Sequence, residues 1–117
     1  MSPLISLPTS IEQLGGGWIA EEALAIGLWC ALAADSPEDG VIAAVNHSGD
    51  SDSTGLIAGH FLGLIHGPDA IPQHWLEQLE LRDVIEQVAW DIVQIPEQYQ
   101  AEDCEVAEAV WQHYPGW

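Results

Sequence analysis

Residues 46–59 read NHSGDSDSTGLIAG. The first half of this segment is polar and contains Gly49, which is typical of a turn. Apolar side chains then recur at helical spacing. They are Leu56, Ile57, Phe61, Leu62, Leu64 and Ile65. The sequence therefore predicts a polar turn that leads into a helix ending near His66 and Gly67.

Oxygen-bearing side chains crowd the start of this helix. Asp50, Asp52 and Ser53 offer two carboxylates and a hydroxyl in quick succession. Hard oxygen ligands at that density suit a divalent metal such as Mg²⁺. Residues two apart do not share a helix face, so Asp50 and Asp52 can converge on one ion only where the chain is still a turn. These three residues are the candidate metal ligands.

Helix capping is a second explanation of the same residues. An Asp or Ser at a helix start accepts free backbone N–H groups, and the helix dipole stabilises an acid there by about 0.3–1 kcal/mol. On the residue pattern alone, capping and metal binding are both open.

Two well-known motifs share these letters and do not fit. The calcium loop of helix–loop–helix proteins requires a bidentate Glu at its twelfth position, where this chain has Phe61. The Asp-x-Asp-x-Thr loop of haloacid dehalogenase-like phosphatases follows a hydrophobic parallel strand. Here residues 46–49 are polar, and no alternation of strands and helices surrounds them.

Helical patterns also flank this segment on both sides. The predicted helices cover residues 10–14, 18–34, 36–46, 72–79, 81–93 and 105–113. The segment 18–34 is apolar around most of its circumference, which predicts a buried helix. Pro96 is predicted to close the helix that begins at residue 81. No segment shows clean strand alternation, so the predicted fold class is all-α.

The chain is strongly acidic. Its 117 residues include 19 Asp and Glu but a single basic residue, Arg82, which gives a formal net charge of -18. This charge argues against DNA and RNA as partners, and it suits divalent cations or a basic partner surface. No apolar run approaches the roughly twenty residues that a membrane helix needs. Cys30 and Cys104 lie outside any CxxC pattern, and no secretory signal precedes them, which predicts free thiols in a reducing cytoplasm.

The segment 46–59 resembles the carboxyl-terminal metal motif of the ADP-ribosylglycohydrolases, a family that includes the dinitrogenase reductase-activating glycohydrolases and crystallin J1. The neighbouring segments agree in order, since GGWIAEEAL at 16–24 resembles the family's preceding helix. The resemblance covers residues 11–93 and implies part of a multi-helical orthogonal bundle. We therefore expect residues 1–93 to be the carboxyl-terminal part of such a domain and residues 94–117 to be an acidic helical tail.

The resemblance implies that Asp50, Asp52 and Ser53 are ligands in a two-metal Mg²⁺ or Mn²⁺ site, with Ser53 in place of a commoner Thr. It implies hydrolysis of the glycosidic bond between ADP-ribose and an acceptor, with the metals as template and Lewis acid. The family's other ligands lie on an amino-terminal motif with an Asp-Asp pair, and this chain contains no such pair. We expect residues outside this chain to complete the site, and the chain alone to be inactive.

The expected partners are ADP-ribose or an ADP-ribosylated protein, and a missing amino-terminal half or a second copy of the chain. The chain would then be a fragment, one half of a split enzyme or a degenerate relative. A non-catalytic, crystallin J1-like scaffold or interaction module is the alternative function. The residues do not indicate the acceptor linkage or the catalytic acid and base.

Two further features of the segment have more than one interpretation. Gly55, Gly59 and Gly63 recur every fourth residue although each glycine costs a helix about 1 kcal/mol, which favours close packing either inside this chain or against another part. His47 either contacts a ligand or is solvated or bonded to the backbone.

Overall fold

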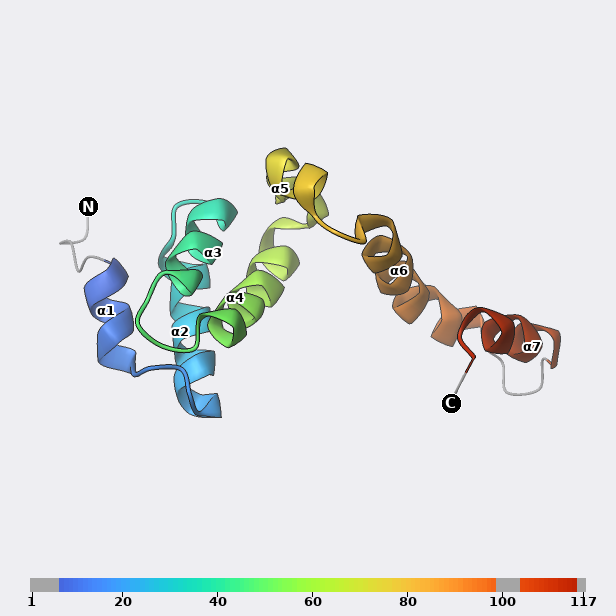
Figure 1. Ribbon diagram of the computed structural model, residues 1–117, viewed down its shortest axis with the longest axis horizontal. Helices are drawn as coiled ribbons and strands as arrows, with labels where there is room; N and C mark the ends of the chain where they lie inside the picture. The colour runs from blue at the N-terminus through green and yellow to red at the C-terminus, as the bar shows by residue number, and fades with distance from the viewer. Residues whose placement is uncertain (1–6, 99–103, 116–117) are drawn as a thin grey trace. The chain divides into compact units, whose positions relative to one another are not determined.

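The computed structural model of the chain describes residues 7–98 and 104–115. Every regular element within these ranges is a helix, which confirms the all-α prediction (Figure 1). The elements are α1 (Leu7–Leu14), α2 (Ala20–Ala33), α3 (Pro37–Val45), α4 (Ser51–His66), the short 3₁₀ helix η1 (Pro68–Ala70), α5 (Gln73–Gln78), α6 (Arg82–Gln98) and α7 (Cys104–His113).

The chain forms two compact units, Met1–Trp75 and Leu76–Trp117. The first unit contains α1 to α4 and the candidate metal ligands, and the second contains α6 and α7. The expectation of a family domain over residues 1–93 with a tail over 94–117 concerns a larger domain, and it stays a prediction.

The core of the first unit lies where α2, α3 and α4 pack on one another (Figure 1). Its buried side chains are mostly small or medium-sized. They are Ile11, Ile26, Cys30, Ala31, Ala44, Ala58 and Leu62. Small side chains let helix backbones approach closely: a Cβ placed on Gly27 of α2 would lie 2.5 Å from Cγ2 of Ile57 in α4. This close packing fixes both helices that flank the polar turn.

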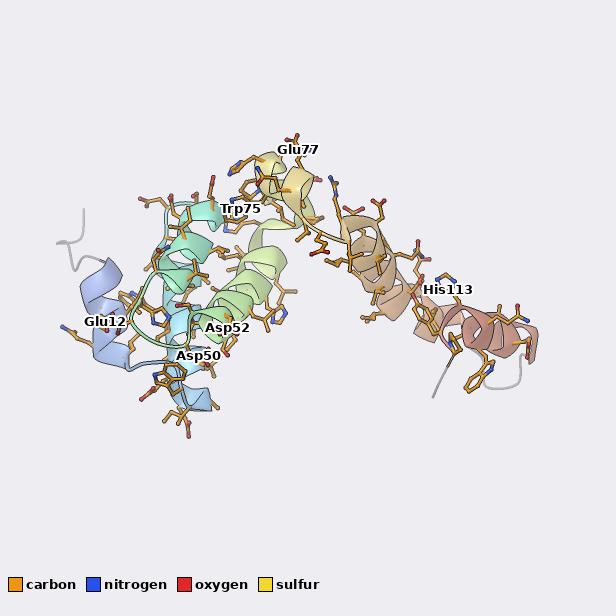
Figure 2. The ribbon with its side chains drawn as sticks, viewed as in Figure 1. Glu12, Asp50, Asp52, Trp75, Glu77 and His113 are labelled. Atoms are coloured by element: carbon orange, nitrogen blue, oxygen red, sulfur yellow. The ribbon has the colours of Figure 1, made fainter. Side chains whose placement is uncertain are left out.

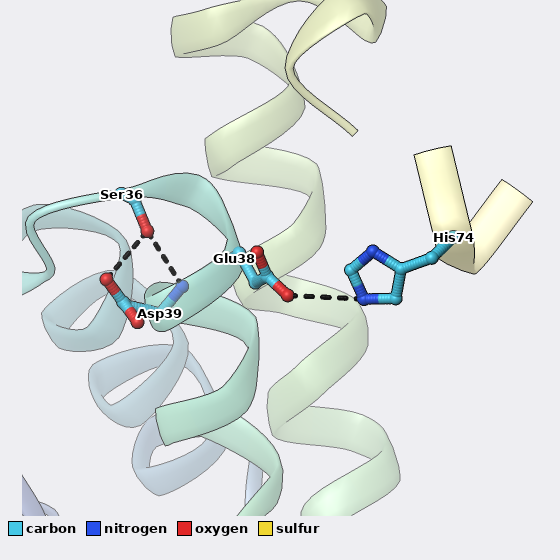
Figure 3. Close-up of polar contacts among 4 residues, drawn as sticks. All are labelled: Ser36, Glu38, Asp39 and His74. Atoms are coloured by element: carbon cyan, nitrogen blue, oxygen red, sulfur yellow. Dashed lines mark hydrogen bonds and ion pairs between the residues drawn. The ribbon is translucent and has the colours of Figure 1, made fainter. Parts of the chain in front are cut away.

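The start of α3 agrees with the helix predicted from residue 36 onward. The Ser36 hydroxyl accepts the backbone N–H of Asp39 at 3.1 Å, and Pro37 is the first helical residue (Figure 3). One residue further on, a carboxylate oxygen of Glu38 lies 3.4 Å from Nε2 of His74, which links α3 to the start of α5. Both side chains of this pair are largely exposed, so it contributes little to stability.

The structure corrects the prediction that residues 18–34 form a fully buried helix. Ala23, Ile26 and Cys30 of α2 are buried, whereas Leu24 and Leu32 are 51% and 68% exposed. Among the described residues, the helices that contact α2 cover one of its faces and leave the other open. An apolar circumference shows that several faces can be buried, but it does not show which faces meet a neighbour.

Two helix boundaries also differ from the predictions. α1 begins at Leu7, whereas the sequence predicts a start at Ser10 with that residue as the cap. Ser10 is therefore inside the helix, and its buried hydroxyl has no hydrogen-bond partner in the described part of the chain. α6 continues past Pro96 to Gln98. A proline beyond the first turn removes one backbone hydrogen bond and crowds the carbonyl four residues earlier, which kinks a helix without always ending it.

The three glycines of α4 have different surroundings. A Cβ on Gly55 would lie 2.6 Å from Cγ1 of Val45, so packing inside the chain accounts for this glycine. A Cβ on Gly59 or Gly63 would meet no described atom within 4 Å. Both glycines instead border an apolar cavity of about 230 Å³. Its other lining residues are Pro37, Val41, Leu62, Gly67, Ala70, Ile71, Pro72 and Trp75.

Cys30 is a free cysteine in this core, as predicted. Burial raises the pKa of its thiol to about 11, so the thiol stays protonated and unreactive at neutral pH. The side chain of Cys104 lies outside the described part of the structure, and its predicted state stays a prediction.

The second unit is held in part by polar contacts along its helices. Arg82 pairs with Glu86 one turn later at 2.9 Å, and the Tyr114 hydroxyl donates to the carboxylate of Asp91. The latter bond raises the pKa of Tyr114. In the ranges that the structure describes, no helix is both long enough and apolar enough to cross a membrane.

Candidate metal site

The predicted polar turn is the loop of residues 46–50 between α3 and α4. Helix α4 begins at Ser51, so Asp50 is the last residue outside it, with φ -76° and ψ 79°. Asp52 and Ser53 lie in the first turn of the helix. Asp50 therefore departs from the helical path, which is the condition for its side chain to meet that of Asp52.

The three predicted ligands lie next to one another at the start of α4. The pKa of the Asp50 carboxyl lies below its usual value, chiefly because the Asp52 side chain hydrogen-bonds to it and next because the Ser53 side chain does. Figure 2 shows both aspartates at the amino-terminal end of α4. Asp52 is exposed, and Asp50 and Ser53 are partly exposed, so all three can be reached from solvent.

The proximity of the two carboxyl groups has a chemical consequence. Ionised carboxylates only accept hydrogen bonds, so neither of them can donate to the other. When both are ionised they repel each other, and a cation between them removes that repulsion. The arrangement therefore favours binding of a proton or a metal ion.

Capping makes little use of the side chain of Asp50. Asp50 occupies the cap position of α4, yet no well-formed hydrogen bond joins its carboxylate to the backbone of the first turn. The Ser53 backbone N–H is only a minor cause of its lowered pKa. The carboxylate is thus available to other partners.

The donor set fits a hard divalent ion in its chemistry, because two carboxylates and a hydroxyl are the oxygen ligands that Mg²⁺ and Mn²⁺ prefer. Across the described residues, no group of three or more His, Cys, Asp or Glu gathers in a way that could hold a metal. Asp50, Asp52 and Ser53 alone therefore do not make a complete metal site.

The turn that follows α1 supports the loop from one side. The backbone N–H of Asp50 donates to the carbonyl of Gly16 at 2.7 Å. Gly49 lies so close to the same residue that a Cβ on it would be 1.8 Å from the Gly16 carbonyl oxygen. The carboxylate of Glu22 in turn accepts the N–H groups of Gly16 and Gly17, at 3.1 and 3.0 Å. Only glycine fits at position 49.

His47 supports the loop from within. Its Nδ1 accepts the backbone N–H of Gly49 at 3.1 Å, and its Nε2 lies 2.8 Å from the hydroxyl of Thr54. Thr54 is fully buried, and its hydroxyl donates to the carbonyl of Ala44 at 2.6 Å. The interpretation of His47 as bonded to the backbone is correct, and the link to Thr54 is an addition from the structure.

Glu12 supports the loop from α1. One carboxylate oxygen accepts the backbone N–H of Ser48 at 3.0 Å and the other accepts its hydroxyl at 2.7 Å. These bonds, the side-chain bond first, lower the pKa of Glu12. Sequence reasoning did not find Glu12, because 36 residues separate it from Ser48 and no local pattern marks the pair.

Comparison with known proteins supports the resemblance. A model of the ADP-ribosylglycohydrolase family matches residues 3–102. An ADP-ribosyl-[dinitrogen reductase] glycohydrolase of Rhodospirillum rubrum is 43% identical over 42 residues, which are 36% of this chain and 14% of that protein. An uncharacterized protein of Archaeoglobus fulgidus is 30% identical over 86 residues, 74% of this chain and 28% of that protein.

A third relative, an ADP-ribosylarginine hydrolase of Pseudomonas putida, is 24% identical over 83 residues, 71% of this chain and 22% of that protein. The chain thus spans between 14% and 28% of the length of these three relatives. No solved structure gives a significant match. Because the family model covers most of its length, the chain belongs to the ADP-ribosylglycohydrolase family.

Proposed function

We propose that this chain contributes the carboxyl-terminal part of an Mg²⁺- or Mn²⁺-dependent ADP-ribosylglycohydrolase. In this proposal Asp50, Asp52 and Ser53 are ligands in a two-metal site that residues outside this chain complete. The single observation that carries the proposal is the position of these three side chains at the cap and in the first turn of one helix, in a member of this family. The free, buried thiol of Cys30 suits the reducing cytoplasm that we propose as its compartment.

The residues of this chain have distinct roles in that site. Asp50 and Asp52 supply two negative charges at the helix start, and Ser53 adds a neutral oxygen. A bound divalent ion would supply Lewis-acid and template chemistry at the ribose and at a water molecule. The chain carries a net charge of -18, so its carboxylates repel the pyrophosphate of ADP-ribose unless cations lie between them.

The names of two relatives indicate the class of substrate. They specify ADP-ribosyl-[dinitrogen reductase] and ADP-ribosylarginine. We propose an ADP-ribosylated protein as the substrate here, with cleavage of the glycosidic bond between ADP-ribose and its acceptor.

The substitution Asp52→Asn tests the metal site, because capping and metal binding predict different results. An amide caps a helix about as well as a carboxylate, so a capping role predicts a nearly silent substitution. A ligand role predicts that Mg²⁺ or Mn²⁺ raises the melting temperature of the wild type by mass action and that the variant loses this shift. Without metal, the variant should be at least as stable as the wild type, since one of two repelling charges is gone.

The matched control is Asp69→Asn, which removes an exposed aspartate in η1, outside the loop. It should keep the metal-induced shift when melting is compared with NaCl at equal ionic strength. A wild-type melting temperature that is the same with Mg²⁺, Mn²⁺ and NaCl would contradict the proposal and leave a non-catalytic scaffold as the better account.

A further inference from the structure

We propose that Glu12 and His47 are positioning residues of the candidate metal site, which hold the loop of residues 46–50 so that Asp50 meets Asp52 and Ser53. This inference rests on the proposed function, because it concerns the same site. In this proposal neither residue is a metal ligand or a catalytic group.

The loop needs support for two reasons. Asp50 lies outside α4 and makes no well-formed capping bond, so the helix alone does not set the place of its carboxylate. The ionised carboxylates of Asp50 and Asp52 also repel each other before an ion binds, which drives the loop away from the helix. Contacts that hold the loop backbone therefore reduce the rearrangement that accompanies metal binding.

Glu12 holds the loop to α1 through a two-pronged contact. Both of its carboxylate oxygens are used by Ser48, one by the backbone N–H and one by the hydroxyl. Hydrogen bonds to a charged acceptor are stronger than neutral ones, and two of them fix orientation as well as distance. Two residues further on, the Asp50 N–H donates to Gly16 in the turn that follows α1. α1 and this turn thus hold the residues on either side of Gly49, Ser48 and Asp50, by hydrogen bonds.

His47 holds the loop to the core in one defined tautomer. The Gly49 N–H can only donate, so Nδ1 must be the unprotonated nitrogen. Nε2 then carries the hydrogen and donates to Thr54, whose own hydroxyl hydrogen goes to the Ala44 carbonyl at 2.6 Å. This relay connects the loop backbone to two fully buried residues, Thr54 and Ala44.

The side chains to be changed are not members of the apolar core. Glu12 and Ser48 are exposed, and His47 is partly exposed although its partner Thr54 is buried. Substitutions that break the contacts should therefore leave the fold in place and alter the site.

The neutral substitutions His47→Asn, His47→Gln and Ser48→Ala separate the contacts without changing the formal charge of the site. Asn places an oxygen where Nδ1 lies and can accept the N–H two residues on, so it keeps the Gly49 contact. Gln can place its amide N–H₂ where Nε2 lies, so it keeps only the Thr54 contact. Ser48→Ala removes one of the two bonds to Glu12.

The measurement is the Mn²⁺ affinity of the full chain, by electron paramagnetic resonance at about pH 8, above the range in which a histidine ordinarily takes up a proton. His47→Gln and Ser48→Ala should weaken Mn²⁺ binding by about tenfold, the scale on which groups that orient metal ligands act. His47→Asn should keep most of the wild-type Mn²⁺ affinity. The double variant Glu12→Gln with Ser48→Ala should bind Mn²⁺ no more weakly than Glu12→Gln alone, because both substitutions act on the same contact. Melting in chelator should leave these variants folded.

The outcomes separate this inference from the proposed function. If Asp50→Asn and Asp52→Asn abolish Mn²⁺ binding while His47→Gln and Ser48→Ala bind like the wild type, positioning by these residues is wrong and the metal site stands. If the two aspartate variants bind Mn²⁺ like the wild type, both ideas fail. If His47→Gln does not fold, Mn²⁺ binding by Ser48→Ala, a substitution at an exposed position, still tests the positioning role. If His47→Asn and His47→Gln lose the same amount of Mn²⁺ affinity, the Gly49 contact has no such role.

Discussion

One residue next to the loop, Thr54, contacts three different parts of the first unit. Thr54 is fully buried, its hydroxyl bonds to Ala44 and His47, and its methyl carbon lies 2.9 Å from where a Cβ of Gly17 would be. It joins the end of α3, the start of α4 and the glycine turn. Threonine suits this position because its side chain combines a hydrogen-bond donor and acceptor with a methyl group.

Thr54→Val should destabilise the first unit more than Thr54→Ser. Valine keeps the shape but leaves the Ala44 carbonyl and the His47 N–H without their partner, which costs about 1–3 kcal/mol. Serine keeps the hydroxyl and loses one buried methyl, for about 0.5–1.5 kcal/mol. Urea denaturation of the two variants checks this order, and a Thr54→Val protein as stable as the wild type would show that the hydroxyl bonds contribute nothing net.

The contact of Glu12 with Ser48 should make stability depend on pH. The folded pKa of Glu12 lies below the ordinary value of 4.5, so the contact contributes fully above that pH and is lost as the pH falls through the lower folded pKa. Glu12→Gln cannot titrate. The difference in melting temperature between wild type and Glu12→Gln should therefore shrink as the pH is lowered from neutrality toward pH 3, while a constant difference would contradict the assigned cause.

Among the elements, α4 combines a packed face with an open one. Its buried residues are Thr54, Ala58 and Leu62, and they face α2 and α3. Gly59 and Gly63 adjoin the apolar cavity and meet no described atom. Glycine thus has different effects within one unit, since Gly27 of α2 permits a close approach to α4, whereas Gly59 and Gly63 of α4 adjoin open space.

Gly59→Ala and Gly63→Ala should each stabilise the chain by up to about 1 kcal/mol, because alanine is the better helix former and its Cβ enters open space. Gly27→Ala is the opposite control. Its Cβ would lie 2.8 Å from Cβ of Ile57 and 3.1 Å from the backbone nitrogen of Ala58, so it should destabilise. Thermal melts of the three variants check the signs, and stabilisation by Gly27→Ala would contradict the described packing of α2 on α4.

For the molecule as a whole, charge and exposed apolar surface act against each other. The net charge of -18 makes copies of the chain repel. At the same time large apolar side chains are exposed in the described residues, including Trp18 at 72% and Leu64 at 85%. Exposed apolar side chains of this size favour association with another protein surface.

Self-association should therefore increase with salt. In about 10 mM salt, where the Debye length is roughly 30 Å, repulsion keeps copies apart, and in about 1 M salt, where it is roughly 3 Å, apolar contact prevails. Sedimentation velocity at several protein concentrations measures this. A single species with the monomer mass in both salts, melting cooperatively, would contradict the expectation that these apolar faces need a partner.

The sequence by itself determined the features that rest on local patterns. Helical spacing of apolar residues gave the all-α class and most helices, and the Ser36-Pro37 start was correct because capping is a matter of neighbouring residues. The cluster of Asp50, Asp52 and Ser53 was visible because the three residues are close in the chain, and the family resemblance, now shown, pointed to the same residues.

The tertiary structure decided what depends on distant residues. The bidentate contact of Glu12 with Ser48 and the close approach of Gly49 to Gly16 join segments more than thirty residues apart, and no local pattern encodes such pairs. The half-buried state of α2 was likewise decided by which helices pack against it, because an apolar side chain has the same sequence signature whether or not a neighbour covers it.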